Sequence, residues 1–255
     1  MTSPDRRPKV KTRLDMLLVE RGLAPSRAKA QALIMAGEVE VEGQVERRAD
    51  RGLPADARLT VRERFPYVSR GALKIERAIA DFGLPVAGRR VLDVGISTGG
   101  FSDYLLKHGA ASVIGVDVTT SQVDSRLRDD PRVRLLERNA RELAPSDLPD
   151  TPDLVVMDLS FISVTKVLPA LRWLTQADFL IMVKPQFEAE RGKVGKGGVI
   201  RDEERRQEIL SRVRTEIERL GYQVRGTTLA GVPGKTGNQE TFFWLTLSGR
   251  ATMAP

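Results

Sequence analysis

"RVLDVGISTGGF", residues 90–101, is an apolar strand that runs directly into a glycine-rich turn, and the fold of most of the chain can be predicted outward from it. Further apolar segments follow, separated by segments with helical periodicity: "SVIGVDV", "VRLLE", "DLVVMDLSF" and "FLIMVK". Buried strands that alternate with helices are typical of a parallel sheet covered on both faces. We therefore predict an α/β fold with a doubly wound, Rossmann-like sheet over residues 70–249.

The C-terminal third adds a helix and two strands to this prediction. "DEERRQEILSRVRTEIERLG" has one apolar face and lies between the N-cap residue Asp202 and the C-terminal Gly221, so it predicts a long amphipathic helix. "YQVRGTTLAG" and "ETFFWLTLS" are joined by a loop rich in glycine and proline, which predicts a hairpin at the sheet edge with an antiparallel last strand. Residues 250–255 are expected to be a tail.

The composition excludes several kinds of chemistry. The chain of 255 residues has no cysteine and a single histidine, His108, so disulfides, thiolate metal sites, Ser-His-Asp triads and histidine-based metal clusters are not expected. No apolar run approaches the roughly 20 residues that span a bilayer, and the N-terminus lacks the apolar core of a signal peptide. We expect a cytoplasmic protein without a membrane partner, whose chemistry uses carboxylates, lysines or a cofactor.

The positive charge is concentrated in the N-terminal quarter. The chain has a formal net charge of +7, and residues 1–66 contain 14 Lys and Arg against 10 Asp and Glu, a net of +4. An excess of this kind indicates an acidic partner, of which nucleic acid is the commonest. The alternative is that these residues form an ordinary solvated face.

Residues 13–64 have the pattern of a small α+β domain. Leucines at helical spacing end at Gly22, a second helix begins after Ser26, and "EVEVEGQV" alternates valines around a Glu42-Gly43 turn. We predict two helices followed by a hairpin, preceded by a basic flexible extension at residues 1–12 and followed by a linker at residues 65–69.

The glycine-rich turn after the first strand of the larger domain is expected to hold a cofactor. Its spacing is Asp-x-Gly-x-x-x-Gly-Gly, beginning at Asp93, and not the G-x-G-x-x-G of dinucleotide-binding proteins. Asp117 ends the next strand, 22 residues after Gly95, where it is placed to bind ribose hydroxyls. An acidic residue beside the loop suits the cationic S-adenosylmethionine better than the diphosphate of NAD. "GVPGKTGNQ", residues 231–239, lacks the first glycine of a P-loop, so an NTPase is not predicted.

Four polar residues are expected where strands or helices end near this turn. Asp158 follows "DLVVM", Lys184 follows "FLIMV", Glu240 begins the last strand, and Lys74 lies on a predicted helix off its apolar face. Each has a plain structural alternative: a helix N-cap for Asp158, a strand-end charge for Glu240 and solvated surface for Lys74. Lys184 is the hardest to explain structurally, because a charge at the end of a buried strand loses hydration, and Pro185 ends the strand there.

These motifs resemble known families in both parts of the chain. "RLDMLLVERGLAPSRAKAQALIMAGEVEVEGQ" closely resembles the S4-type RNA-binding domain. "VSRGALKIERAI", "VLDVGISTGGFSD", "GVDV", "VMDLSFIS", "VKPQFEAERGKVGKGGVIRD" and "GNQETF" match in order the FtsJ-like 2′-O-ribose methyltransferases, and with the S4-type module the chain resembles the haemolysin-like TlyA family. Ile96 and Ala72 depart from the family pattern, where alanine and glycine are usual.

The resemblance implies an S-adenosylmethionine-dependent methyltransferase of ribosomal RNA or ribosomal subunits, with site residues as follows. The catalytic Lys-Asp-Lys-Glu tetrad would be Lys74, Asp158, Lys184 and Glu240. The cofactor would contact Asp93, Gly95, Thr98, Gly99, Gly100, Phe101, Asp117 and Asn139. RNA would contact Arg13, Arg27, Lys29, Arg47, Arg48, Arg70, Lys193 and Lys196.

We expect Lys184 to accept the proton of a ribose 2′-hydroxyl, with Asp158 orienting it, Lys74 holding the nucleotide and Glu240 fixing the lysines. Three alternatives stay open on the sequence alone. A ribosome-assembly factor could bind RNA without chemistry, a haemolysin could act on membranes, and an NAD-dependent enzyme could use the same kind of sheet.

Overall fold

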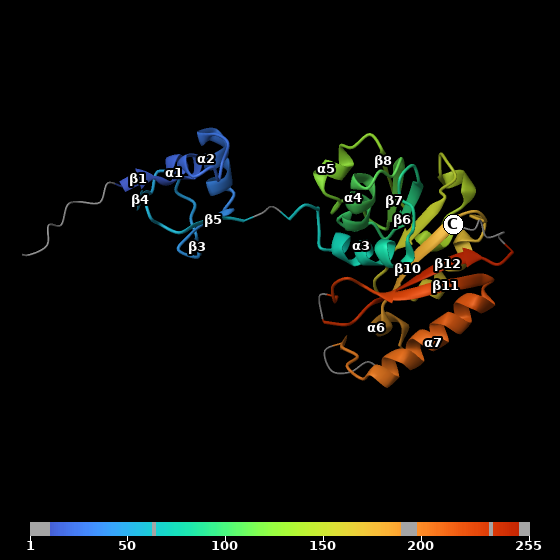
Figure 1. Ribbon diagram of the computed structural model, residues 1–255. Helices are drawn as coiled ribbons and strands as arrows, with labels where there is room; N and C mark the ends of the chain where they lie inside the picture. Colours follow the sequence, from blue (N-terminus) through green and yellow to red (C-terminus); the bar gives the residue numbers. More distant parts are fainter. Residues whose placement is uncertain (1–10, 63–64, 190–197, 235–236, 250–255) are drawn as a thin grey trace, which may run out of the picture. The chain divides into compact units, whose positions relative to one another are not determined.

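The computed structural model describes residues 11–62, 65–189, 198–234 and 237–249 (Figure 1). The chain forms two compact units, Met1–Pro66 and Tyr67–Pro255. Each unit has a hydrophobic core of its own, which is the physical basis for treating each as a domain.

The N-terminal unit contains two short helices, a two-stranded sheet in the order β1-β4 and a three-stranded sheet in the order β3-β2-β5. The helices pack Leu14, Leu18 and Ile34 into the core at zero exposure. The elements are β1 (Lys11–Arg13), α1 (Leu14–Glu20), α2 (Arg27–Met35), β2 (Val39–Val41), β3 (Gln44–Val45), β4 (Gly52–Pro54) and β5 (Leu59–Val61).

The local signals that predicted this unit are confirmed. The Ser26 hydroxyl accepts a hydrogen bond from the backbone N–H of Lys29 at 3.3 Å and so caps α2. Glu42 and Gly43 both have positive φ, 51° and 80°, as a two-residue hairpin turn between β2 and β3 requires. One difference concerns the predicted basic extension, because Lys11 and Thr12 pair with Pro54 and Leu53 in β1-β4. Residues 1–10 lie outside the described part.

The C-terminal unit is built on a seven-stranded sheet in the order β11-β12-β10-β9-β6-β7-β8. The pairs among β10, β9, β6, β7 and β8 are parallel, while β12 is antiparallel to both of its neighbours. The predicted doubly wound sheet and its antiparallel last strand are therefore confirmed. The strands are β6 (Arg90–Val94), β7 (Ser112–Asp117), β8 (Val133–Glu137), β9 (Leu154–Met157), β10 (Asp178–Val183), β11 (Tyr222–Leu229) and β12 (Thr241–Leu247).

Helices cover both faces of this sheet, so its central strands are buried almost continuously and successive residues belong to different cores. Leu92 and Val94 of β6 belong to the core that includes α7, whereas Val91 belongs to the core that includes α3 and α4. The helices are α3 (Gly71–Phe82), α4 (Gly100–Lys107), α5 (Ser125–Arg128), α6 (Pro185–Glu188) and α7 (Glu203–Arg219), with 3₁₀ turns η1 (Ala140–Glu142), η2 (Pro145–Asp147), η3 (Val164–Lys166) and η4 (Leu168–Leu171). Figure 1 shows α7 beside β11.

The topology places a crevice between β6 and β9. β6 is followed along the chain by β7 on one side, and the chain then returns to β9 on the other side, so the strand order reverses between β6 and β9. Ligands of open α/β sheets bind at the carboxyl ends of the strands at such a point. The residues that directly follow β6, β9 and β10 are Gly95, Asp158 and Lys184.

Tyr222 offers a test of how this unit is held together. Its ring is 1% exposed, lies edge-on to Phe179 at 5.1 Å, and its hydroxyl donates a 2.8 Å hydrogen bond to the carbonyl oxygen of Leu168. Tyr222→Phe keeps the ring but removes that donor, so we expect the free energy of unfolding to fall by about 1 kcal/mol. Urea denaturation would measure this as a lower midpoint with the same slope, and an unchanged midpoint would contradict it.

Candidate active site

A cavity of about 590 Å³ opens at the carboxyl ends of β6, β9 and β10. This volume lies within the roughly 300–1,000 Å³ of typical small-molecule sites. Ten of the residues that the sequence assigned to function line it: Lys74, Asp158, Lys184, Glu240, Asp93, Gly95, Thr98, Gly100, Phe101 and Arg70. The fold therefore brings the four polar residues of the predicted tetrad and most of the predicted cofactor residues into one place.

Lys184 is buried at the end of β10 and is paired with Asp158. It is 8% exposed, and its Nζ lies 2.5 Å from Asp158 Oδ1 and donates to the Ser160 hydroxyl at 3.2 Å. Nζ also lies 5.8 Å from the centre of the Phe187 ring, within cation–π range. Pro185 at the first position of α6 ends the strand, so the chain leaves the sheet directly after the lysine. The carboxylate offsets the lysine's loss of hydration.

A second ion pair lies across the cavity. Lys74 on α3 places its Nζ 2.6 Å from Oε2 of Glu240, which directly precedes β12 and whose side chain is 3% exposed. The loop before β12 is packed against both elements: a Cβ at Gly231 would lie 2.1 Å from the Leu73 carbonyl, and one at Gly234 would lie 2.7 Å from Glu240 Oε1. The segment that resembles a P-loop in sequence thus supports this ion pair.

The glycine-rich turn allows backbone to approach backbone. Gly95 has φ +85°, and a Cβ there would lie 2.6 Å from the Asp158 carbonyl oxygen. A Cβ at Gly100 would lie 2.3 Å from the Ser69 hydroxyl and 3.1 Å from Gly71 Cα. These close approaches connect the turn to Asp158 on one side and to the start of α3 on the other.

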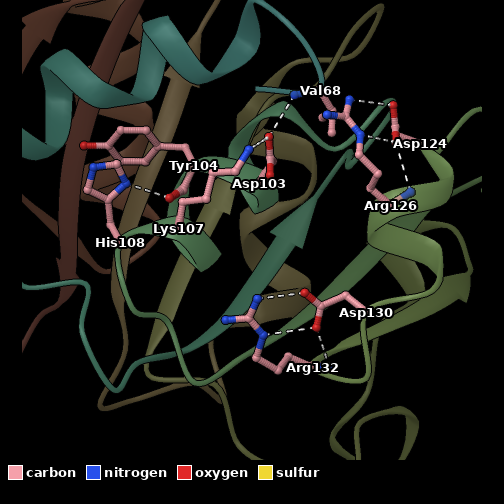
Figure 2. Close-up of polar contacts among 9 residues, drawn as sticks. All are labelled: Val68, Asp103, Tyr104, Lys107, His108, Asp124, Arg126, Asp130 and Arg132. Carbon is pink, nitrogen blue, oxygen red and sulfur yellow. Dashed lines mark hydrogen bonds and ion pairs between the residues drawn. The ribbon is translucent and has the colours of Figure 1, made fainter. Parts of the chain in front are cut away.

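Asp103, in the first turn of α4, holds the segment that leads into α3. Its carboxylate accepts a 2.8 Å hydrogen bond from the backbone N–H of Val68 and pairs with Lys107 at 2.9 Å (Figure 2). His108, at the end of the same helix, stacks on Tyr104 and contacts its carbonyl oxygen through Nδ1 at 2.8 Å. The single histidine therefore packs against its own helix and is not part of the cavity lining.

Asp93 is a buried carboxylate at the base of the cavity. It is 1% exposed, and its Oδ2 accepts a 2.6 Å hydrogen bond from the Ser102 hydroxyl. Burial raises the pKa of Asp93 to about 7, with the negative charge of Asp158 acting in the same direction and Ser102 opposing it. Within the described residues its Oδ1 has no hydrogen-bond partner.

Three of the predicted cofactor residues lie outside the cavity lining. Gly99 forms the N-cap of α4 with φ 93°, and a Cβ there would collide with Leu127. One carboxylate oxygen of Asp117 accepts a 3.0 Å hydrogen bond from the backbone N–H of Ser97, which stabilises the turn. Asn139 caps η1 through the N–H of Arg141.

Sequence reasoning missed several residues of the lining: Ser97, Gln122, Ser160, Phe161, Gln186 and Phe187. Phe161 is 89% exposed, has φ +67°, and lies 5.0 Å from Phe187, centre to centre. Gln186 Oε1 is buried without a hydrogen-bond partner among the described residues. Four of the six, Ser160, Phe161, Gln186 and Phe187, lie within three positions of Asp158 or Lys184 in the sequence, and this proximity was the available signal. Ser97 and Gln122 have no such signal.

The predicted RNA-binding residues fall in different places. Arg13 and Arg27 share the carboxylate of Asp15, and Arg47 donates to the Met35 carbonyl. Lys29 and Arg48 are exposed, and Arg70 lies on the lining of the cavity in the other unit. Lys193 and Lys196 lie outside the described residues.

The two departures from the family pattern are accommodated by packing. Ile96 is 3% exposed, and its side chain occupies the space above Gly115 on β7, where a Cβ would lie 2.2 Å from Ile96 Cδ1. Ala72 is fully buried in the core shared by α3 and α4. The isoleucine and the alanine therefore leave the turn and the helix in place.

Comparison with known proteins agrees with this geometry. The FtsJ-like methyltransferase family matches residues 67–247, and the S4 domain matches residues 12–54. The fold and the site thus define an enzyme of the methyltransferase class with a Rossmann-like sheet, and the family implies S-adenosylmethionine as the cofactor.

Individual relatives cover nearly the whole chain. The 16S/23S rRNA (cytidine-2′-O)-methyltransferase TlyA of Mycobacterium tuberculosis is 45% identical over 96% of this chain and 93% of its own. Hemolysin A of Brachyspira hyodysenteriae is 41% identical over 89% and 97%. A solved structure from Streptococcus thermophilus, also named as a hemolysin, has a TM-score of 0.69 and 34% identity over 94% of this chain and 90% of that one. The chain belongs to the FtsJ-like methyltransferase family and, within it, to the TlyA type that carries an S4 domain.

The residues present fit S-adenosylmethionine. The cofactor's amino-acid end carries an ammonium group, and Asp93 Oδ1 is a buried acceptor that lacks a hydrogen-bond partner in the described structure. Gly95 and Gly100 keep the lining free of side chains at the turn. Asp93, Gly95, Thr98 and Phe101 are the residues that would hold the cofactor.

Gly95→Ala tests the close approach between the turn and Asp158. The added methyl group must displace the Asp158 backbone, so we expect S-adenosylmethionine affinity, measured by calorimetry, to fall by about tenfold or more. Gly88→Ala is the matched control: Gly88 also has positive φ, +76°, but nothing lies within 4 Å of its added Cβ. Equal affinities for the two variants would contradict the role given to Gly95.

Proposed function

We propose that this protein transfers a methyl group from S-adenosylmethionine to a ribose 2′-hydroxyl of ribosomal RNA in the cytoplasm. The observation that carries the proposal is the pairing of the buried Lys184 with Asp158 at the switch point of the sheet. The name of the mycobacterial relative, a 16S/23S rRNA (cytidine-2′-O)-methyltransferase, supports the reaction and the substrate. The S4 domain supports RNA as the partner.

Lys184 accepts the proton of the attacking hydroxyl group. A ribose hydroxyl is a weak nucleophile, and a base within hydrogen-bond distance strengthens it by taking its proton as the new bond forms. The ammonium group produced lies 2.5 Å from the Asp158 carboxylate, which stabilises the added charge. S-adenosylmethionine, when bound, supplies the electrophilic methyl group.

Lys74 and Glu240 position the nucleotide. The Nζ of Lys74 is held 2.6 Å from the Glu240 carboxylate beside the cavity. A fixed cation there favours the negative charge that develops on the ribose oxygen and the adjacent phosphates. Because Glu240 is 3% exposed and packed by Gly234, the lysine has little freedom to move away.

Phe161 supplies an aromatic surface at the mouth of the cavity. A large apolar side chain that is 89% exposed and held in a positive-φ conformation is costly without a ligand. Aromatic rings stack on unpaired bases in RNA-binding sites. A nucleotide whose ribose reaches Lys184 would have its base near Phe161 and Phe187.

The rival functions lack a comparable observation. No helix within the described ranges is long and apolar enough to cross a membrane. A non-catalytic assembly factor would have no need for two ion-paired lysines in a cavity of small-molecule size. A labelled-methyl assay on ribosomal subunits separates this rival from the enzyme.

Lys184→Ala tests the proposed base. We expect the rate of methyl transfer to ribosomal RNA to fall by about 10²- to 10⁴-fold, with S-adenosylmethionine affinity retained. Lys166→Ala, which removes an exposed lysine from η3, should transfer methyl groups at the normal rate. Near-normal turnover by Lys184→Ala would refute the assignment.

The raised pKa of Asp93 predicts a pH dependence of cofactor binding. Below pH 7 the carboxyl group is largely neutral, and above pH 7 it becomes an anion that attracts the cationic cofactor. We expect S-adenosylmethionine affinity to increase by about threefold to tenfold between pH 6 and pH 8. Asp93→Asn should bind with an affinity that does not change over this range, and a wild-type affinity independent of pH would contradict the prediction.

A further inference from the structure

Asp15 is a fully buried carboxylate in the first turn of α1, in the N-terminal unit. Its Oδ1 accepts from Arg13 Nε at 3.0 Å, and its Oδ2 accepts from Arg13 Nη2 at 3.0 Å, Arg27 Nε at 3.0 Å and Gln31 Nε2 at 2.8 Å. The bonds from Arg13 hold the pKa of Asp15 well below its usual range, against the opposing effect of burial. The carboxylate is therefore charged at neutral pH.

The two arginines reach this carboxylate from different elements. Arg13 ends β1, and Arg27 is the first residue of α2. Their side chains remain 45% and 55% exposed. Because both guanidinium groups bond to one carboxylate, they lie next to each other, and the three groups together carry a charge of +1. Asp15 uses two of the five N–H donors of Arg13 and one of those of Arg27.

We propose that Asp15 is a positioning residue that holds Arg13 and Arg27 as one clamp for the phosphate backbone of RNA. The proposal rests on the proposed function, in which the N-terminal unit binds ribosomal RNA. Guanidinium groups bind phosphate oxygens through paired N–H donors in a fixed geometry. Two such groups that are already ordered by a buried anion lose less side-chain freedom on binding than two free arginines would.

The positioning role of Asp15 and the net charge of the unit predict opposite changes in RNA affinity when Asp15 is neutralised. Asp15→Asn removes a negative charge from a basic RNA-binding unit, so long-range attraction alone would make RNA bind more tightly. If Asp15 acts by positioning, the same substitution weakens binding, because the neutral amide keeps one acceptor oxygen and its NH2 group cannot accept from a guanidinium N–H. The sign of the change separates the two effects.

The experiment uses the full chain and purified 16S and 23S rRNA. Asp15→Asn should raise the Kd by about tenfold. Glu20→Gln, which removes an exposed carboxylate from the same helix, is the charge-matched control and should leave the Kd unchanged or lower it. Circular dichroism and thermal unfolding would verify that each variant is folded, and Arg27→Lys, which keeps the charge but loses the planar fork, should also weaken binding.

A double-mutant cycle guards against a merely structural effect of Asp15. Arg27→Ala should weaken RNA binding in the wild-type background. It should weaken binding much less in the Asp15→Asn background, because Arg27 is no longer held by the carboxylate there. Full additivity of the two substitutions would overturn the proposal.

The remaining outcomes distinguish the clamp from the proposed function. Tight binding by Asp15→Asn together with weak binding by the arginine variants would overturn the positioning role and leave RNA binding by this unit intact. Normal binding by Arg13→Ala and Arg27→Ala would overturn both the clamp and the assignment of these arginines to RNA.

Discussion

A charged lysine that is withdrawn from water is stabilised by a carboxylate beside it. The site of the C-terminal unit contains two such pairs. Lys184 is paired with Asp158, and Lys74 is paired with Glu240. Each pair joins two elements that are far apart in the chain, the end of β10 with the end of β9 and α3 with the start of β12. Because Lys184 or Glu240 left alone would be a buried unpaired charge, these elements must keep their relative positions for the fold to be stable.

Glycines at the points of contact allow the elements that carry these ion pairs to approach one another closely. The turn after β6 passes so close to Asp158 and to the start of α3 that a side chain at Gly95 or Gly100 would collide with its neighbours. The loop before β12 meets α3 at Gly231 in the same way. Where the cavity is lined by Gly95 and Gly100 it is therefore bounded by backbone, which has no rotamers to change, and this part of its wall is more rigid than one built from long side chains.

The sequence predicted the architecture well because its strongest signals are periodic. The apolar segments that became β6 and β10 and the amphipathic α7 were recognisable from local pattern alone, and so was the capped α2. Asp117 shows a detail that such reasoning does not reach: its position after β7 was predicted, whereas the hydrogen bond that its carboxylate accepts from the backbone N–H of Ser97 was not. Phe161 also escaped prediction, because an exposed aromatic in a loop has no periodic signature.

The order of the strands has a consequence for how the protein is made. β12 comes last along the chain among the described strands, but it lies inside the sheet between β10 and β11 and is preceded by Glu240. During synthesis the N-terminal unit, which has a hydrophobic core of its own, can fold as soon as it emerges. The cavity, which Glu240 lines directly before β12, is complete only after β12 has inserted. A nascent chain can thus fold its S4 domain well before its methyltransferase domain is complete.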